Sequence, residues 1–341
     1  MRDLVAAYDH LSAGPRQVGR AVVTSVWGSA PRAEGAAMLA TRDGAVAGSV
    51  SGGCVESAAA AEIAAAIERG SPRLVTFGVS HEDAWAVGLA CGGTIRIFVE
   101  PGVRPEILDA ARGPGGEVVA TIIDGPGTGA AVRVSADGRV SGGADLPRDI
   151  VRDAALAALR REASGTITVD QPGGATTVFL EVFPRQPRLI IVGATHVGAA
   201  LVPLARRLGY RTIVADGRAA FLTPERFPEA DALIPAWPEE AFDRIGLDAT
   251  CYVCVLSHDP KFDEPALRLA LRSPAAYIGA LGSRKTQAER RERLAAEGFT
   301  GNDIARIHGP IGLDLGGRAP AETALAILAE MTRVRYGRET G

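Results

Sequence analysis

Two cysteines, each next to paired glycines, are the residues of this chain best suited to chemistry. The first lies in Ser51-Gly52-Gly53-Cys54, directly before an alanine-rich stretch that predicts a helix over 56–69. The second lies in Cys91-Gly92-Gly93, before a stretch that predicts a strand over 94–100. Glycine lets the backbone approach a ligand closely, and a helix N-terminus favours the thiolate form of cysteine. The two elements therefore predict a cradle for an anion, or for a soft metal bound by Cys54 and Cys91.

The simpler alternative is that these cysteines and glycines serve packing and turns, since free cysteine is often buried as a small hydrophobic residue. Packing is what we expect of the other two cysteines, Cys251 and Cys254. They stand in one apolar stretch that predicts a strand, so their side chains should point to opposite faces. That arrangement favours core packing over a redox-active pair.

A glycine-containing turn in the second half has part of the pattern that binds dinucleotides. Gly193-Ala194-Thr195-His196-Val197-Gly198 stands where a predicted strand meets a predicted helix. It keeps the first and third glycines, but Thr195 replaces the middle one, which lets a pyrophosphate approach. Asp216 ends the next predicted strand, where an acidic side chain can hold ribose hydroxyls. Gly193, His196, Gly198 and Asp216 thus predict a phosphate-bearing ligand, while Thr195 argues against ordinary NAD binding.

Two further loops follow predicted strands, at the edge where open α/β sheets bind ligands. Ser283-Arg284-Lys285 opens a predicted helix, and Ser283 is a good N-cap. The positive end of the helix dipole disfavours two cations in the first turn of a helix. An anion bound at that terminus would make the interaction with these cations favourable. The alternative is that both cations extend into solvent. His258 follows the fourth strand and should face the Gly193 turn, as a base, a ligand contact or a solvated residue.

The first half of the chain predicts a mixed α/β domain. Helices are expected over 4–11, 56–69 and 149–162, and strands over 20–27, 36–41, 73–79, 94–100, 117–123, 130–134, 166–170 and 176–183. The stretch Phe183-Pro184-Arg185-Gln186-Pro187 marks a boundary, because two prolines bracket polar residues between predicted strands. We therefore expect domains over 1–183 and 187–336.

The second half alternates strands and helices. The strands are largely apolar and are expected over 189–192, 212–215, 232–236, 251–256, 276–281 and 305–308, with a last helix over 320–335. Continuously apolar strands are typical of sheets that are covered on both faces. The pattern predicts a Rossmann-like, doubly wound and mostly parallel sheet.

Composition limits the kinds of partner. The 341 residues are 47% hydrophobic, which is enough for two cores, and the net charge of -3 gives no reason to expect nucleic acid. No apolar run reaches the roughly 18 residues of a membrane-spanning helix. The four cysteines show no regular disulfide spacing, which favours a reducing cytoplasm. We expect no nucleic-acid or membrane partner, and a homodimer because twofold association is the commonest form.

Several motifs in order along the chain resemble the xanthine dehydrogenase accessory protein family, also called the XdhC/CoxI family. These motifs are Ala30-Pro31-Arg32, Gly48 to Glu56, Cys91-Gly92-Gly93, Ser257-His258-Asp259, Leu281 to Lys285, and Ile311 to Glu322. The resemblance spans nearly the whole chain. One departure is Thr195, because many members of the family have Gly-Ala-Gly-His-Val at this turn.

The resemblance implies a non-catalytic role in the maturation of molybdenum hydroxylases. Members of the family are thought to bind molybdenum cofactor, either molybdopterin or its cytidine dinucleotide form, and to protect it during sulfuration. They then pass it to an apo molybdenum hydroxylase, which implies that hydroxylase and a cysteine desulfurase as partners. The cysteine motifs are associated with this task, and Ser283-Arg284-Lys285 would suit the cofactor's phosphate. The competing hypothesis is an NAD(P)-dependent oxidoreductase with His258 as its acid or base.

Overall fold

The chain forms two compact units, Met1–Arg185 and Gln186–Gly341. The computed structural model describes residues 1–28, 32–78, 93–171, 174–257 and 259–337. None of the helices in these ranges has both the length and the apolar character needed to cross a bilayer.

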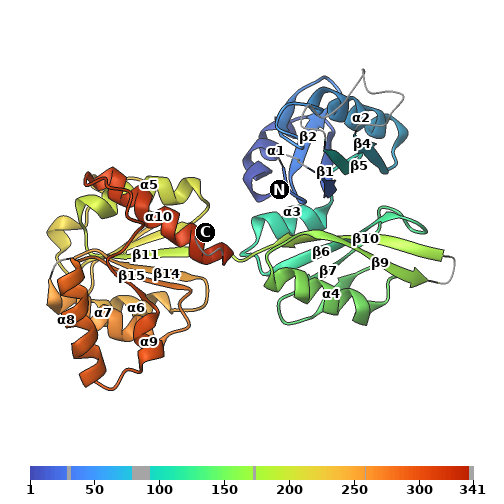
Figure 1. Cartoon of the computed structure of the whole chain (residues 1–341). Coiled ribbons are helices and arrows are strands. Elements are labelled where there is room, and N and C mark those ends of the chain that lie inside the picture. The colour runs from blue at the N-terminus through green and yellow to red at the C-terminus, as the bar shows by residue number, and fades with distance from the viewer. Residues whose placement is uncertain (29–31, 79–92, 172–173, 258, 338–341) are drawn as a thin grey trace. The chain divides into compact units, whose positions relative to one another are not determined.

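The N-terminal unit begins with the short helix α1 and a sheet covered by a helix (Figure 1). The antiparallel strands are ordered β3-β2-β1-β5-β4. Helix α2 packs on this sheet through Ala59, Ile63 and Ala66, which are fully buried. The bounds are α1 Val5–Leu11, β1 Val18–Trp27, β2 Ala37–Thr41, β3 Val46–Gly48, α2 Glu56–Arg69, β4 Arg73–Phe77 and β5 Thr94–Glu100.

A second antiparallel sheet in the same unit repeats the connectivity of the first. Its strand order is β8-β7-β6-β10-β9, with one helix again inserted between its third and fourth strands along the chain. The bounds are α3 Pro105–Arg112, β6 Glu117–Asp124, β7 Ala131–Ser135, β8 Val140–Gly142, α4 Arg148–Arg160, β9 Gly165–Gln171 and β10 Gly174–Phe183. The unit is therefore a structural repeat, with α3 between its two halves in the chain.

The two halves differ in the connection from the third strand to the helix. In the first half this connection comprises residues 49–55, and in the second half it comprises residues 143–147. Only the longer one contains serine or cysteine. Because the scaffold is the same, the longer connection is an elaboration of the first half.

A buried ion cluster joins the two sheets of the N-terminal unit. The guanidinium of Arg20, on β1, donates to Glu100 Oε2 on β5 at 2.9 Å and to Glu181 on β10. Arg104 Nε also donates to Glu100, at 2.9 Å. Arg20 is 1% exposed and both glutamates are 3% exposed. We call these four residues the Arg20 cluster, whose members each have a partner of opposite charge, as buried charges require.

The C-terminal unit is a doubly wound parallel sheet, as the sequence predicts. Its strand order is β13-β12-β11-β14-β15-β16, the order of a Rossmann fold. The strands are β11 Arg188–Val192, β12 Arg211–Ala215, β13 Ala232–Ile234, β14 Cys251–Val255, β15 Tyr277–Ala280 and β16 Ile307–His308. The helices are α5 His196–Arg207, α6 Pro238–Ile245, α7 Pro260–Arg272, α8 Arg284–Ala296, α9 Gly301–Ala305 and α10 Pro320–Tyr336.

Two hydrophobic cores cover opposite faces of this sheet, one with α5 and α10 and the other with α6 and α7 (Figure 1). Cys254 belongs to the first core and Cys251 to the second, and both are buried. The prediction that these cysteines face opposite sides is confirmed. In the first core, Glu330 of α10 accepts hydrogen bonds from Tyr277 Oη at 2.6 Å and from Gly312 N at 2.9 Å. Glu330 thereby anchors the glycine-rich loop 309–317 to helix α10.

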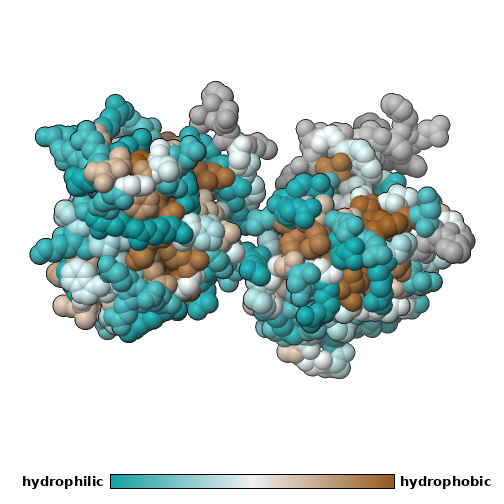
Figure 2. All heavy atoms as spheres, turned by 90° about the horizontal axis from the view of Figure 1, so that it is seen from below, coloured by the Kyte–Doolittle hydropathy of each residue, from teal (hydrophilic) through white to brown (hydrophobic). Residues whose placement is uncertain are grey.

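The surface carries hydrophobic residues in separate patches. On the face shown in Figure 2, these patches are interrupted by hydrophilic residues on each unit. Much of the surface of any folded domain is apolar.

Candidate functional site

Cys54 is exposed, in the connection between β3 and α2. We call this connection, residues 49–55, the Cys54 loop. Gly52 and Gly53 have φ angles of +79° and +124°, which residues with a side chain rarely adopt. Ser51 is buried within the loop at 1% exposure. The glycines thus allow a sharp turn that leaves the thiol on the outside.

The carboxylate of Glu56, the first residue of α2, turns back and holds the Cys54 loop together. Its Oε1 accepts from Ser49 Oγ at 2.6 Å and from Ser51 N at 2.9 Å. Its Oε2 accepts from Ser51 Oγ at 2.7 Å, from Gly53 N at 2.8 Å and from Val55 N at 3.2 Å. Burial raises the pKa of the Glu56 carboxyl, but the hydrogen bonds from the two serines outweigh it and lower that pKa to about 2. Glu56 is therefore ionised at neutral pH.

Two further amides of the loop are engaged as well. Gly52 N donates to Ser49 Oγ at 2.8 Å, and Cys54 N donates to Ser51 Oγ at 3.0 Å. The backbone donors that the glycine-rich pattern would offer to an anion are thus directed at groups of the loop itself and at Glu56. The thiol of the Cys54 loop is thus exposed, whereas these amides are engaged within the chain.

The second cysteine element lies mostly outside the described residues. Gly93 is buried directly before β5, whereas Cys91 and Gly92 fall in the range 79–92, which the structure does not describe. Among the residues that it does describe, no three His, Cys, Asp or Glu side chains are grouped so as to hold a metal ion. A metal bound by Cys54 and Cys91 together stays a prediction.

The Gly193 turn is closed by hydrogen bonds within the chain. Gly193 has a φ of +106°, and a Cβ there would lie 2.8 Å from Ser257 N, so only glycine fits. Thr195 caps α5 by accepting from Gly198 N at 3.2 Å, and Thr195 N donates to Gly193 O at 2.9 Å. Ala194 N donates to Asp216 Oδ2 at 2.8 Å. Several donors that would face a pyrophosphate therefore already have acceptors, and the predicted contact His196 is exposed on the first turn of α5.

Asp216 is held by its neighbour Arg218. Its Oδ1 accepts from Arg218 N at 2.8 Å and from Arg218 Nε at 3.0 Å, and its Oδ2 accepts from Arg218 Nη2 at 2.8 Å. Burial raises the pKa of the Asp216 carboxyl, but the hydrogen bonds from Arg218 and Ala194 outweigh it, so that pKa is lowered. A ribose hydroxyl at Asp216 would have to compete with this guanidinium.

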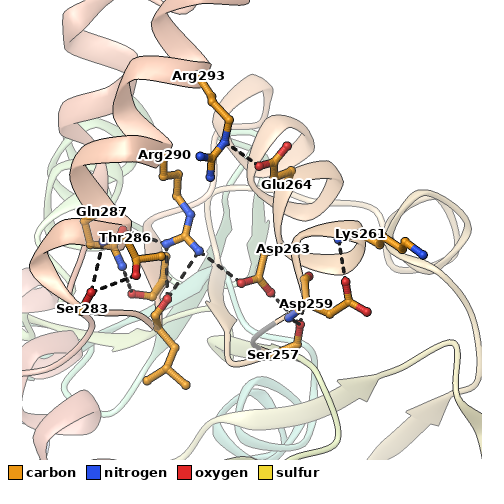
Figure 3. A network of polar contacts seen from close by, with 12 residues as sticks. Ser257, Asp259, Lys261, Asp263, Glu264, Ser283, Thr286, Gln287, Arg290 and Arg293 are labelled. Carbon is orange, nitrogen blue, oxygen red and sulfur yellow. Dashed lines mark hydrogen bonds and ion pairs between the residues drawn. The ribbon is translucent and has the colours of Figure 1, made fainter.

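A pocket of about 220 Å³ lies between helices α7 and α8. Figure 3 shows the polar network around it. Its polar lining comprises Asp263 and Glu264 on α7, the N-cap Ser283, and Thr286, Arg290 and Arg293 on α8. Asp263 Oδ1 accepts from Ser257 Oγ at 2.7 Å, and Oδ2 accepts from Arg290 at 3.2 Å. The network thus connects the pocket to Ser257, beside the Gly193 turn.

Of the predicted residues around this pocket, Ser283 alone is in its lining among those that the structure describes. Arg284 and Lys285 are exposed, and Lys285 Nζ lies 3.9 Å from Glu289 Oε1 on the same helix. The cations of the pocket are instead Arg290 and Arg293, which the sequence reasoning missed. A signal was present in their spacing, since positions 286, 290 and 293 share one face of a helix that Ser283 caps. His258 lies outside the described residues.

Comparison with known families matches both units. A model of the XdhC Rossmann domain matches residues 189–331, and a model of the XdhC and CoxI family matches residues 11–78. Together the matches span more than half of the chain. The chain belongs to the XdhC/CoxI family. The resemblance inferred from the motifs is thereby confirmed.

Curated relatives cover both units of this XdhC/CoxI chain. A Bacillus subtilis protein described as a probable subunit of xanthine dehydrogenase is 28% identical over 317 residues, or 92% of each chain. The molybdenum cofactor insertion chaperone PaoD of Escherichia coli is 26% identical over 324 residues, or 94% of this chain and 85% of PaoD. The uncharacterized Escherichia coli protein YqeB is 33% identical over 164 residues, which are 48% of this chain but 30% of YqeB.

A solved structure has the same fold. The crystal structure of a xanthine dehydrogenase from Bacillus halodurans matches with a TM-score of 0.76, at 24% sequence identity. The match covers 98% of this chain and 96% of the other. At this identity the likeness supports the fold alone.

Proposed function

We propose that the chain is an accessory protein that binds molybdenum cofactor and delivers it to a molybdenum hydroxylase of the xanthine dehydrogenase type. The observation that carries the proposal is the exposed thiol of Cys54 on a loop that Glu56 holds in place. Family membership and a relative named as a molybdenum cofactor insertion chaperone support it.

The geometry of the Cys54 loop suits a carrier. A thiolate is a soft ligand that fits molybdenum and competes poorly for hard cations. The loop orders the thiol before binding, which lowers the entropic cost of holding the cargo. Because the thiol is exposed, a receiving enzyme can reach the cargo as well. The cofactor is thus cargo in this proposal, and the chain itself carries out no chemical step on it.

Titration of the purified full-length chain with molybdenum cofactor under anaerobic conditions tests the proposal. Bound molybdenum and bound pterin are measured separately, and we expect one of each per chain if Cys54 and Cys91 share one cofactor. Cys54→Ser should weaken binding about tenfold or more, because it removes the soft ligand and keeps the side-chain shape. Ser57→Ala, at an exposed position in the first turn of α2, is the matched control and should bind as the wild type does.

Two results would count against the proposal. Failure of the wild type to bind either molybdenum or pterin would remove the function. Binding that survives in Cys54→Ser and in Cys91→Ser would leave the function but reject the thiols as its ligands.

We do not extend the proposal to hydride transfer with NAD(P). Several turn donors, and the carboxylate that such a cofactor would use, are engaged by Thr195, Asp216 and Arg218 within the chain. Titration with reduced nicotinamide cofactor should accordingly show no saturable change in its fluorescence. Saturable binding followed by substrate turnover would reinstate the oxidoreductase.

We further propose that residues 1–183 and 187–336 act as separate functional domains of a cytoplasmic homodimer, and that a cysteine desulfurase supplies sulfur to the bound cofactor. Native mass spectrometry of the freshly purified chain reports its oligomeric state and retained ligand together. A monomer at micromolar concentration would reject the dimer. Pull-down of the desulfurase by the cofactor-loaded chain tests the remaining partner.

A further inference from the structure

We propose that the pocket between α7 and α8 binds a tetrahedral oxyanion, such as inorganic phosphate or the phosphate of a phosphomonoester, through Ser283, Thr286, Arg290 and Arg293. The inference goes beyond the proposed function, because it assigns a ligand to the C-terminal unit whether or not the Cys54 loop binds molybdenum cofactor. It depends on which hydrogen-bond donors and acceptors in the pocket lining already have partners.

The acceptors in the pocket wall are already engaged. Each oxygen of Asp263 has a donor, from Ser257 and from Arg290. Glu264 Oε1 accepts from Arg293 Nε at 2.8 Å, and Glu264 Oε2 accepts from Arg268 at 3.1 Å. The two carboxylates thus hold the arginines in position, as Figure 3 shows for the pairs with Arg290 and Arg293. A cation entering the pocket would have to displace these partners.

The donors in the same wall exceed the acceptors. Arg290 is 4% exposed, and its Nε is one of three buried side-chain polar atoms in the described part of the chain that have no hydrogen-bond partner. Its two terminal nitrogens are used, by Gln287 Oε1 at 2.7 Å and by Asp263. Arg293 uses only Nε among the contacts recorded for the described residues. A buried donor without an acceptor costs free energy, so Arg290 contributes a positive charge with an incomplete set of acceptors to the pocket wall.

The N-terminus of α8 adds to this surplus. The helix has 13 residues and no acidic residue in its first turn, and its N-cap Ser283 accepts from Thr286 N at 3.2 Å. The backbone N–H groups of Arg284 and Lys285, in the first turn, have no intrahelical acceptor, and the helix dipole makes this end positive. By contrast, α7 already has Asp259 as a capping carboxylate and Asp263 in its first turn. The positive end of α8 is thus the one that lacks an anion.

Size and position favour a phosphate group over a larger ligand. The pocket, at about 220 Å³, is smaller than the roughly 300–1,000 Å³ of sites that enclose a drug-sized molecule. It opens beside the ends of β14 and β15, at the edge where open α/β sheets bind ligands. A phosphomonoester would therefore place its phosphate inside and the rest of the molecule outside.

Isothermal titration of the full-length chain at low ionic strength tests the proposal. Inorganic phosphate and cytidine 5′-monophosphate are the two probes, and we expect a Kd of about 1 mM or tighter for at least one of them. Tighter binding of the nucleotide would identify a phosphomonoester as the natural ligand, and equal binding would identify free phosphate. Arg293 is exposed, and the variant Arg293→Gln should weaken binding about tenfold, because it removes about one charge-assisted hydrogen bond to the anion.

The matched control is Arg284→Gln, which removes the same charge from the same helix outside the pocket lining. It should weaken binding less than about twofold, since exposed charges interact weakly across solvent. Arg290→Lys is the second variant, because lysine can keep the ion pair with Asp263 but has no Nε donor; it should also weaken binding. No saturable binding of either probe, or equal losses in Arg293→Gln and Arg284→Gln, would overturn the proposal.

Discussion

Replacing Glu56 by glutamine should loosen the Cys54 loop, and the effect should depend on pH. The carboxylate accepts from three backbone amides and two hydroxyls of the loop. A glutamine has the same shape but replaces one acceptor oxygen by an NH₂ donor. Whichever way the amide is turned, that donor faces at least one backbone N–H, from Ser51 or from Gly53 and Val55.

The magnitude follows from the pKa of Glu56. A shift from 4.5 to about 2 corresponds to roughly 3 kcal/mol of preference for the ionised form in the folded chain. The loop is partly open to solvent, which screens the interaction, so we expect a loss of about 2 kcal/mol at neutral pH. In a unit of this size, that loss lowers the melting temperature by about 4–8 °C.

The sign of the pH dependence is fixed by the direction of the shift. A lowered pKa in the folded state stabilises the chain above the unfolded pKa of about 4.5 and loses this contribution as the pH falls toward 2. The difference between wild type and Glu56→Gln should therefore be greatest above pH 5 and should shrink at lower pH, where Glu56 becomes protonated. Differential scanning calorimetry from pH 7 to pH 3 measures it.

Hydrogen–deuterium exchange gives the local readout, since amides 51–55 should exchange faster in Glu56→Gln. The control is Glu106→Gln, which removes a carboxylate from the first turn of α3 in the same unit but none of the hydrogen bonds recorded for the described residues. A stability difference that stays constant from pH 7 to pH 3, or unchanged exchange in residues 51–55, would refute the assignment of Glu56 as the organiser of the loop.

Three further results are expected. Arg20→Ala should lower the free energy of unfolding by about 3–5 kcal/mol, because it leaves the buried glutamates of the Arg20 cluster with too few partners, whereas Arg16→Ala at an exposed pair should cost less than about 0.5 kcal/mol. Urea unfolding compares the two, and similar losses would contradict a special role for the cluster. Glu330→Leu should cost about 1–3 kcal/mol and expose loop 309–317 to protease, because it removes the carboxylate oxygen that accepts from both Tyr277 Oη and Gly312 N; an unchanged cleavage rate would count against it. An alkylating reagent at neutral pH should modify Cys54 quickly and the two strand cysteines only after unfolding, because burial raises the pKa of both strand thiols and shields them; peptide mass spectrometry follows the label, and early modification of the strand cysteines would contradict their burial.

The architecture of the C-terminal unit could be predicted from the sequence because its signals are local and repeated. Apolar strands alternate with helices, and each predicted strand of this unit overlaps an observed one. The structural repeat of the N-terminal unit was not predicted, because the two halves share connectivity rather than sequence pattern. Helix α3 was also missed, although Pro105 in its first turn is a usual start signal.

The sequence by itself determined which residue types could act and where each would sit on its element. It placed Cys54 before a helix, Ser283 at an N-cap and Gly193 at the end of the first parallel strand, since each depends on neighbours in the chain. Only the tertiary structure decided which hydrogen-bonding groups remain available to a ligand. Glu56 accepts from three amides of the Cys54 loop, Arg218 holds Asp216, and Arg290 meets Asp263 across two helices that lie apart in sequence. The physical reason is that a hydrogen bond forms only where folding brings its donor and its acceptor within reach of each other. The periodicity of a sequence reports only the direction in which each side chain leaves the backbone.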